Sequence, residues 1–178
     1  MNKIEFTKRC LSDALFQLMK EKSFEEISIQ EIVDKAGFSR MAYYRNFSSI
    51  RDIIDYFLEV NILSSFKEAN VDIASGRLAT FFNIFFQTVT TDRCREISEV
   101  FRKQQLLTLV YSVFYRAFVY HAPEEKKYYC AYVAGGIFGT YIQWILSGYK
   151  ETVEELKEAL NKQFMIQYQQ WSDEAYKK

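Results

Sequence analysis

Four side chains at helical spacing are well suited to contact DNA: Arg40, Met41, Tyr44 and Arg45. A guanidinium can pair with both acceptors on a guanine edge, so Arg40 is the strongest candidate to recognise a base. The alternative is a surface arginine that contacts only phosphate or water, because phosphate contacts outnumber base contacts in protein–DNA complexes. The hydroxyl of Tyr44 can donate to a phosphate oxygen, or its ring can be a half-buried part of the core. The residues expected to face the opposite way are Ala42, Tyr43 and Phe47.

The segment around these side chains has the pattern of two short helices joined by a tight turn, with a third helix directly after. Ser28 and the glutamate three residues later form a capping box, which predicts a helix from Ile29. Gly37 ends that helix, because glycine adopts the left-handed conformation at little cost. Ser39 can cap the second helix, and a capping box at Ser49 begins the third. This pattern predicts a helix-turn-helix, whose second helix can enter the major groove.

Composition and length indicate a helical globular protein. The chain has 178 residues, 49% of them hydrophobic, with one proline and six glycines. Periodicities of 3.6 residues are common and alternating patterns are scarce, which predicts an all-α fold. Three widely spaced cysteines favour free thiols, so we expect no metal site and no cofactor. No apolar run is long enough to span a bilayer and the N-terminus lacks a signal sequence, so we expect a cytoplasmic protein without membrane contact.

The distribution of charged residues along the chain is more informative about DNA binding than the net charge. The chain carries 23 basic and 23 acidic residues, which gives a net charge of zero. Up to Arg51, nine basic residues stand against seven acidic ones, and every charged residue from Arg40 to Arg51 is basic. A local basic face is compatible with phosphate contact, although a short basic run is more often a solvated surface.

Helical patterns continue along the chain and predict a small N-terminal head followed by a larger helical body. The predicted helices cover residues 3–22, 29–36, 40–47, 50–69, 77–90, 96–103, 104–121, 123–147 and 153–171. A turn-rich stretch at 70–76 (NVDIASG) is the best candidate boundary. We therefore predict a helix-turn-helix domain at 1–50 with a linking helix at 50–69, and a second domain at 70–178.

Residues 4–58 resemble the DNA-binding head of the TetR (tetracycline-repressor) family of bacterial transcription regulators. The resemblance rests on the capped helix at Ser28, the turn at 36–39 (AGFS) and the segment at 44–47 (YRNF), followed by a serine-led helix. The segment at 134–144 (AGGIFGTYIQW) is similar to the penultimate helix of many members. The resemblance implies an all-α protein with a three- or four-helix head and a ligand-binding and dimerisation body at 70–178.

The resemblance assigns DNA contact to residues on all three helices of the motif: Ser28, Gln30, Ser39, Arg40, Met41, Tyr44, Arg45, Asn46 and Arg51. By position, Arg40 and Met41 match base-edge contacts, and Tyr44 matches a tyrosine that bonds a phosphate. One position departs from the pattern. Many members carry a phosphate-binding lysine where this chain has Ile50, so either Arg51 takes over that contact or the contact is absent.

The body is rich in aromatic residues at helical spacing, which by default form a core. The resemblance implies a pocket among them for a small hydrophobic effector, whose binding would change the spacing of the recognition helices. Few charged residues are interleaved there, so a neutral apolar ligand is favoured over an anionic one. The candidate pocket residues are Phe82, Phe85, Phe86, Phe101, Tyr111, Phe114, Tyr115, Phe118, Tyr141 and Trp144.

Glycines inside a predicted helix point to close packing against another backbone, because each costs up to about 1 kcal/mol relative to alanine. The resemblance implies a homodimer formed by the last two helices. The candidate interface residues are Gly135, Gly136, Gly139, Gln143, Leu160 and Phe164. The alternatives are close packing within one subunit, or room left for a ligand.

Enzyme chemistry is disfavoured. The only histidine, His121, lies near a helix end, and no phosphate-binding loop or metal-ligand spacing is present. The resemblance implies instead a homodimer that binds a palindromic operator in double-stranded DNA, represses transcription as the family more commonly does, and responds to a hydrophobic effector. The alternative is a helical small-molecule or protein-binding module without specific DNA binding, which Ile50 and the zero net charge keep open.

Overall fold

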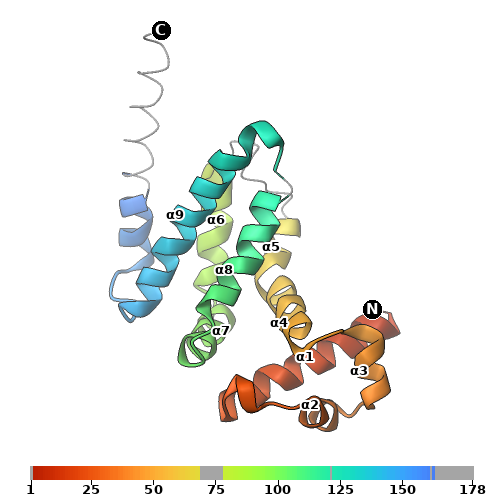
Figure 1. Ribbon diagram of the computed structural model, residues 1–178. Coiled ribbons are helices and arrows are strands. Elements are labelled where there is room, and N and C mark those ends of the chain that lie inside the picture. The colour runs from red at the N-terminus through yellow and green to blue at the C-terminus, as the bar shows by residue number, and fades with distance from the viewer. Residues whose placement is uncertain (1, 69–77, 121, 161, 163–178) are drawn as a thin grey trace. The chain divides into compact units, whose positions relative to one another are not determined.

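The computed structural model describes residues 2–68, 78–120, 122–160 and 162, and these residues form helices and no strand (Figure 1). The all-α fold predicted from the sequence is confirmed. The chain divides into two compact units, Met1–Gly139 and Thr140–Lys178. Within the described ranges, no helix is long and apolar enough to cross a membrane. The predicted domain boundary at 70–76 lies outside the described residues.

The first unit begins with the helix-turn-helix and the helices around it, which we call the head: α1 (Lys3–Glu21), the 3-10 helix η1 (Phe24–Glu26), α2 (Ile29–Ala36), α3 (Arg40–Asn46) and α4 (Ile50–Leu58). The predicted helix at 50–69 is helical over its described length but changes type. α4 passes into the π-helix η2 (Glu59–Leu63) and then into α5 (Ser64–Glu68). Helix, turn and capped helix therefore follow one another as the sequence predicts.

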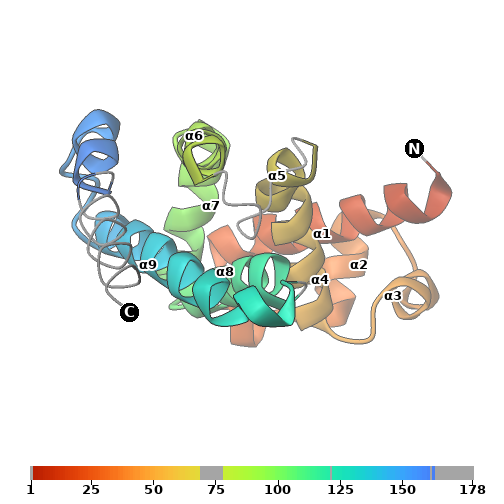
Figure 2. The ribbon, with the colours of Figure 1, turned by 90° about the horizontal axis from the view of Figure 1, so that it is seen from above.

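The helices after the head are α6 (Leu78–Val89), α7 (Asp92–Lys103), α8 (Leu107–Tyr115), the π-helix η4 (Arg116–Tyr120), the 3-10 helix η5 (Glu124–Lys126) and α9 (Lys127–Leu146). We call α6 to α8, η4 and η5, with α9 as far as Gly139, the body. Seen from above, α5 and α6 lie on one side of the first unit and α8 lies on the other (Figure 2). In the second unit, α9 ends and residues 153–160 are helical.

The core of the head is formed where α1 packs against α2 and α4. Leu11 and Leu15 of α1 are buried, and the ring of Phe16 stacks on that of Phe57 with centroids 4.7 Å apart. An apolar stripe at helical spacing from Phe6 to Leu18 predicts that Phe6 faces inward, but its side chain is 50% exposed near the start of α1. The Phe6 ring meets the ring of Phe38 in an edge contact, with centroids 6.5 Å apart.

The boundaries of α7 differ from those predicted. The polar residues at 92–95 belong to the helix, because the Thr91 hydroxyl accepts a hydrogen bond from the Cys94 N–H (3.2 Å) and starts the helix at Asp92. The helix predicted from residue 104 begins only at Leu107. Between α7 and α8, Gln105 adopts the left-handed conformation with φ of 59°, which separates the two helices.

Gln104 joins the body to the head at this break. Its Nε2 donates hydrogen bonds to the carbonyl oxygens of Met19 (2.7 Å) and Lys22 (2.8 Å), and its Oε1 accepts one from the N–H of Phe24 (3.0 Å). These groups are carbonyls at the end of α1 and the amide that opens η1, which the helices themselves leave without partners. One amide side chain therefore holds the chain between α1 and α2 against α7.

A second contact between body and head is made by Arg93 of α7. Its guanidinium lies over the ring of Phe16 (4.7 Å) and that of Phe57 (5.4 Å), and its Nε donates to Asn61 Oδ1 (3.3 Å). Arg93 thus contacts α1, α4 and η2 together. Cation–π contact between body and head stabilises this arrangement by about 0.5–1 kcal/mol for each exposed pair.

We expect Gln104→Leu to lower the free energy of unfolding by about 1–3 kcal/mol. Leucine has a similar size, but it leaves carbonyls of α1 without their donor, and an unsatisfied buried polar group carries that cost. Urea denaturation at neutral pH measures the change. Gln87→Leu, at an exposed position of α6, is the control and should alter stability by less than about 0.5 kcal/mol. Equal effects of the two substitutions would show that the Gln104 hydrogen bonds contribute nothing.

Candidate nucleic-acid interface

The first helix of the motif is fixed by a complete capping box. The Ser28 hydroxyl accepts a hydrogen bond from the N–H of Glu31 (3.3 Å), and Glu31 Oε2 accepts one from the N–H of Ser28 (2.9 Å). Lys22 Nζ also donates to Glu31 Oε1 (2.6 Å). Hydrogen bonding to Lys22, and then to the backbone and hydroxyl of Ser28, lowers the pKa of Glu31 to about 2. The carboxylate stays ionised and holds the start of α2.

The turn between α2 and α3 has the geometry that the sequence predicts. Gly37 adopts φ of 72° and ψ of 33°, and the N–H of Phe38 donates to the carbonyl of Val33 (2.9 Å). A side chain at this φ would be strained, which explains the glycine. Ser39 then caps α3, its hydroxyl accepting from the N–H of Ala42 (3.2 Å). The second helix of the motif therefore starts at Arg40.

α3 presents two opposite faces. Tyr43 is fully buried and Phe47 is 6% exposed, whereas Met41 is 62% and Tyr44 57% exposed. Arg40, the first residue of α3, and Arg45 are also exposed. The division into inward and outward faces predicted from the spacing is confirmed. Exposed apolar and aromatic side chains between arginines are unusual on a solvated helix, and they suit a helix that contacts another surface.

Several of the predicted DNA-contact residues already have partners within the head. Arg45 Nη2 lies 3.3 Å from Met41 Sδ, and Asn46 Nδ2 donates to the carbonyl of Ala42 (2.7 Å). Gln30 Nε2 donates to Asp34 Oδ1 (2.8 Å) on its own helix. These contacts fix the side chains before any ligand binds, which reduces the entropy lost on binding.

The first turn of α4 carries Arg51, whose guanidinium points along the helix to Asp55. Ser49 and Asp52 form a second capping box, and hydrogen bonding to Ser49 lowers the pKa of Asp52. Ile50 is half-buried. Arg51 is turned toward its own helix and the body: its Nε donates to Asp55 Oδ1 (3.3 Å) and its Nη2 to Ser112 Oγ (3.1 Å). The structure therefore places the guanidinium of Arg51 between α4 and α8.

Asp55 is also bound from the body. Arg116 Nη2 donates to Asp55 Oδ2 at 2.7 Å, so two arginines share this carboxylate. Arg116 is the first residue of the π-helix η4, and α4 itself passes into a π-helix one turn later. π-Helical segments occur often at functional sites. The Arg51, Asp55 and Arg116 side chains form a polar connection between α4 and the helices of the body.

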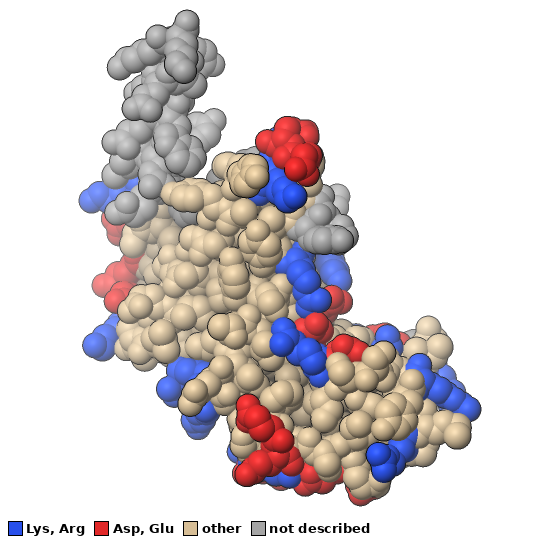
Figure 3. Space-filling model, viewed as in Figure 1, with Lys and Arg blue, Asp and Glu red and all other residues tan. Residues whose placement is uncertain are grey.

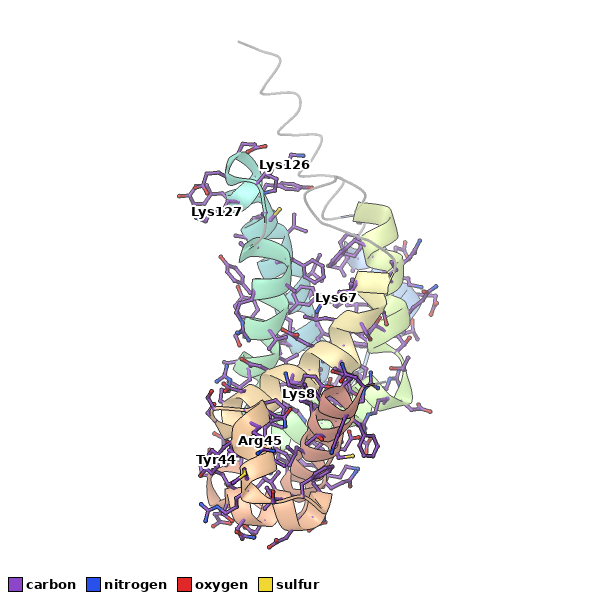
Figure 4. All side chains as sticks on the ribbon, turned by 90° about the vertical axis from the view of Figure 1, so that its right-hand side faces the viewer. Lys8, Tyr44, Arg45, Lys67, Lys126 and Lys127 are labelled. Atoms are coloured by element: carbon purple, nitrogen blue, oxygen red, sulfur yellow. The ribbon has the colours of Figure 1, made fainter. Side chains whose placement is uncertain are left out.

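A basic residue that the sequence analysis did not single out lies beside the motif. Lys8 Nζ is 5.6 Å from the ring centroid of Phe47 and 5.6 Å from that of Tyr56. In Figure 4, Lys8 lies on the same side of the head as Tyr44 and Arg45. The sequence does contain an indication of this position. Lys8 is three residues before Leu11 and seven before Leu15, so the cation shares a face of α1 with two apolar residues.

The candidate pocket residues are mostly buried, and those of the first unit pack against one another. The ring centroids of Phe114 and Phe118 lie 4.7 Å apart, and those of Phe85 and Phe114 lie 6.2 Å apart. Further ring contacts join Phe82 with Phe86, Tyr111 with Tyr115 and Tyr111 with Phe138. Phe101 is fully buried in α7. Tyr141 and Trp144 belong to the second unit, with centroids 6.4 Å apart.

The candidate dimer residues occupy different environments. On α9, Gly136 and Gly139 are exposed and Gly135 is half-buried near the Tyr111 hydroxyl. Tyr128 is 85% and Tyr132 45% exposed on the same helix. In the second unit, Gln143 is exposed and Leu160 is buried. Phe164 lies outside the described residues.

Comparisons with known proteins cover both the head and the body. Residues 11–57 match the family described as bacterial regulatory proteins, tetR family. Residues 79–166 match the family described as transcriptional regulator C-terminal region. A relative from Haemophilus influenzae, named an uncharacterized HTH-type transcriptional regulator, is 29% identical over 92 residues. That alignment covers 48% of this chain and 45% of the relative, so the chain spans about half the length of the relative that it matches.

The depressed pKa of Glu31 predicts a pH-dependent contribution to stability. The ordinary pKa is 4.5 and the pKa in the folded chain is about 2, so the stabilisation is present above pH 4.5 and is lost as the pH falls toward 2. We expect Glu31→Gln to lower the urea midpoint at pH 7 and to differ progressively less from the wild type as the pH falls from 4.5 to 2. Glu124→Gln, which removes an exposed carboxylate, is the control. A difference independent of pH would contradict the assignment.

Proposed function

The chain belongs to the TetR family of bacterial transcriptional regulators and has a DNA-binding helix-turn-helix, and we propose that it acts as a homodimeric repressor. In this proposal the domain at 1–50 binds a palindromic operator, and the domain at 70–178 dimerises and binds a small hydrophobic effector. The observation that carries the proposal is the exposed face of α3. Arg40, Met41, Tyr44 and Arg45 project from a helix that is capped at its start and buried along its other side.

The outward face of α3 has the chemistry for both parts of DNA recognition. Arg40 stands in the first turn, from which recognition helices contact base edges. Tyr44, with 57% of its surface exposed, offers a hydroxyl that can donate to a phosphate. Met41 offers an apolar surface that suits the methyl group of thymine. We therefore assign base contact to Arg40 and Met41 and backbone contact to Tyr44.

Two features support the proposed dimer, the size of α3 and the surface of α9. A single seven-residue helix contacts only a few base pairs, and a symmetric pair of heads doubles the site. Tyr128, Tyr132, Gly136 and Gly139 are exposed along α9 at spacings of three and four residues, which places them on one face. Figure 3 shows few charged side chains over α8 and the adjoining part of α9. An uncharged face with glycines suits close contact with a second copy.

Control by an effector is supported by the position of the aromatic cluster. Phe114 belongs to the cluster and lies on α8, and Ser112 of the same helix accepts a hydrogen bond from Arg51. A ligand that separates these rings would move α8, and with it the contacts to α4. The aromatic lining favours a neutral hydrophobic molecule.

A second candidate function is a TetR-like binding module without specific DNA recognition. The observation that favours it is the start of α4, where Ile50 carries no charge and Arg51 contacts Asp55 and Ser112. Selection of DNA duplexes from a random library by the wild-type protein distinguishes the two candidate functions. Enrichment of a palindrome with a steep salt dependence supports the repressor, and the absence of enrichment supports the module.

We expect Arg40→Ala to weaken discrimination at one base pair of each half-site by about 1–3 kcal/mol, because a guanidinium that pairs with a base edge contributes that much. Competition binding against operators changed one base pair at a time measures it. Arg102→Ala, which removes an arginine paired with Glu99 on α7, is the control and should leave the preference intact. If Arg40→Ala discriminates between base pairs as well as the wild type does, then Arg40 contacts only phosphate or solvent.

We expect Gly139→Arg to convert the dimer to a monomer without unfolding the chain. A Cβ at Gly139 meets no described atom within 4 Å, and removing a helical glycine improves helix propensity by up to about 1 kcal/mol. Sedimentation equilibrium measures the mass, and operator affinity should fall with it. Asn83→Arg places the same side chain on the exposed face of α6 and should remain dimeric. A dimeric Gly139→Arg protein would place the interface elsewhere.

A further inference from the structure

The basic residues of the head fall into two groups according to whether a carboxylate pairs with them. Five form ion pairs: Arg9, Lys20, Lys22, Lys35 and Arg51. The other four have no carboxylate within ion-pair distance among the described residues: Lys3, Lys8, Arg40 and Arg45. A cation that is neutralised within the fold gains little from a phosphate, whereas one without a carboxylate releases counterions when it binds DNA. The second group is therefore the one suited to phosphate contact.

The four cations of the second group come from the N-terminal half of α1 and from α3. Among them, Lys8 has its ammonium group over the rings of both Phe47 and Tyr56. Phe47 ends α3 and Tyr56 lies on α4, so Lys8 stands where α1, α3 and α4 meet. The nearby carboxylate of Glu5 is occupied by the hydroxyl of Tyr56 (2.6 Å) and by Arg9 (3.4 Å).

Lys8 lies on the side of the head from which α3 projects its polar side chains. In Figure 4, Lys8, Arg45 and Tyr44 follow one another across the head, from α1 to α3. The ring contact with Phe47 brings the ammonium group near the residues between α3 and α4. Phe47 stands in the chain between Tyr44 and the first turn of α4, the two groups that would hold a phosphate in the proposed complex.

The start of α4 lacks a cation of its own that could take this role. Ile50 is apolar and half-buried, and Arg51 is bound to Asp55 and to Ser112 of the body. We propose that Lys8 of α1 makes a contact with a DNA backbone phosphate and so supplies the positive charge that position 50 lacks. This contact rests on the proposed function as an operator-binding protein. It strengthens binding to any duplex sequence, because an ammonium group paired with phosphate does not distinguish bases.

The test compares Lys8→Met with the wild-type chain. Methionine retains an unbranched apolar stem over the two rings and removes only the charge. Binding to the selected operator and to an unrelated duplex is measured between 50 mM and 1 M salt. We expect the slope of log K against log salt to become shallower by about 0.9 for both duplexes. At 0.1 M salt the operator affinity should be roughly tenfold lower, and near 1 M salt it should equal that of the wild type.

Three further variants make the result specific. Lys67→Met, on α5, removes a cation that lies 3.7 Å from Glu59 and should keep the wild-type slope. Lys8→Arg retains a cation and should also keep it. Ile50→Lys added to Lys8→Met should restore the slope and the affinity, because it places the charge at the start of α4. Thermal unfolding of each variant shows that the head remains folded.

The outcomes separate this contact from the proposed function. A Lys8→Met protein with lower thermal stability but an unchanged salt slope would show that Lys8 only packs on the two rings, and would overturn the proposal. An equal change of slope in Lys67→Met would overturn it as well. A wild-type chain that binds neither duplex contradicts the proposed function and this contact with it. Wild-type binding with an unchanged slope in Lys8→Met contradicts the contact alone.

Discussion

A seven-residue helix is not stable by itself in water, and this constraint governs the whole head. Forming the first turn fixes several residues for one hydrogen bond, so α3 depends on groups outside its own backbone. The Ser39 hydroxyl satisfies an amide at its start, and Gly37 sets the angle at which the chain enters. On its inner side, the fully buried ring of Tyr43 meets Phe47. The outer face of α3 is free for recognition because the inner face and the start carry the stabilising contacts.

The head in turn depends on the body through a few polar side chains. Gln104 bonds the end of α1, and Arg93 covers the Phe16 and Phe57 rings that join α1 to α4. On the other side of α4, Arg116 binds Asp55. Each contact has a defined geometry, so a shift of α7 or α8 changes its length or breaks it. The proposed control by an effector requires a connection of this kind between the body and α3.

The local parts of this arrangement could be predicted from the sequence, and the long-range parts could not. Capping boxes, the glycine turn and the two faces of α3 depend on residues within four positions of one another, so their spacing is visible in the chain. Gln104 bonds residues 80 to 85 positions away, and nothing in its neighbours marks it. The polar residues at 92–95 indicate a loop, so the sequence places the start of the helix too late. In the structure α7 begins at Asp92, because Thr91 supplies the cap. The position of Lys8 required knowing that α1 packs against Phe47 and Tyr56.

Zero net charge is compatible with DNA binding once the pairing of the charges is considered. The 23 basic and 23 acidic residues cancel in sum, but ion pairs remove many of them locally. Lys22 is neutralised by Glu31 and Arg51 by Asp55, whereas Arg40 and Arg45 face solvent without a carboxylate partner among the described residues. In the proposed complex, the electrostatic attraction for phosphate comes from a small number of positions on α1 and α3. Such a distribution keeps non-specific attraction weak, because that attraction grows with each phosphate contacted. Discrimination then rests on the base-edge contacts proposed for α3.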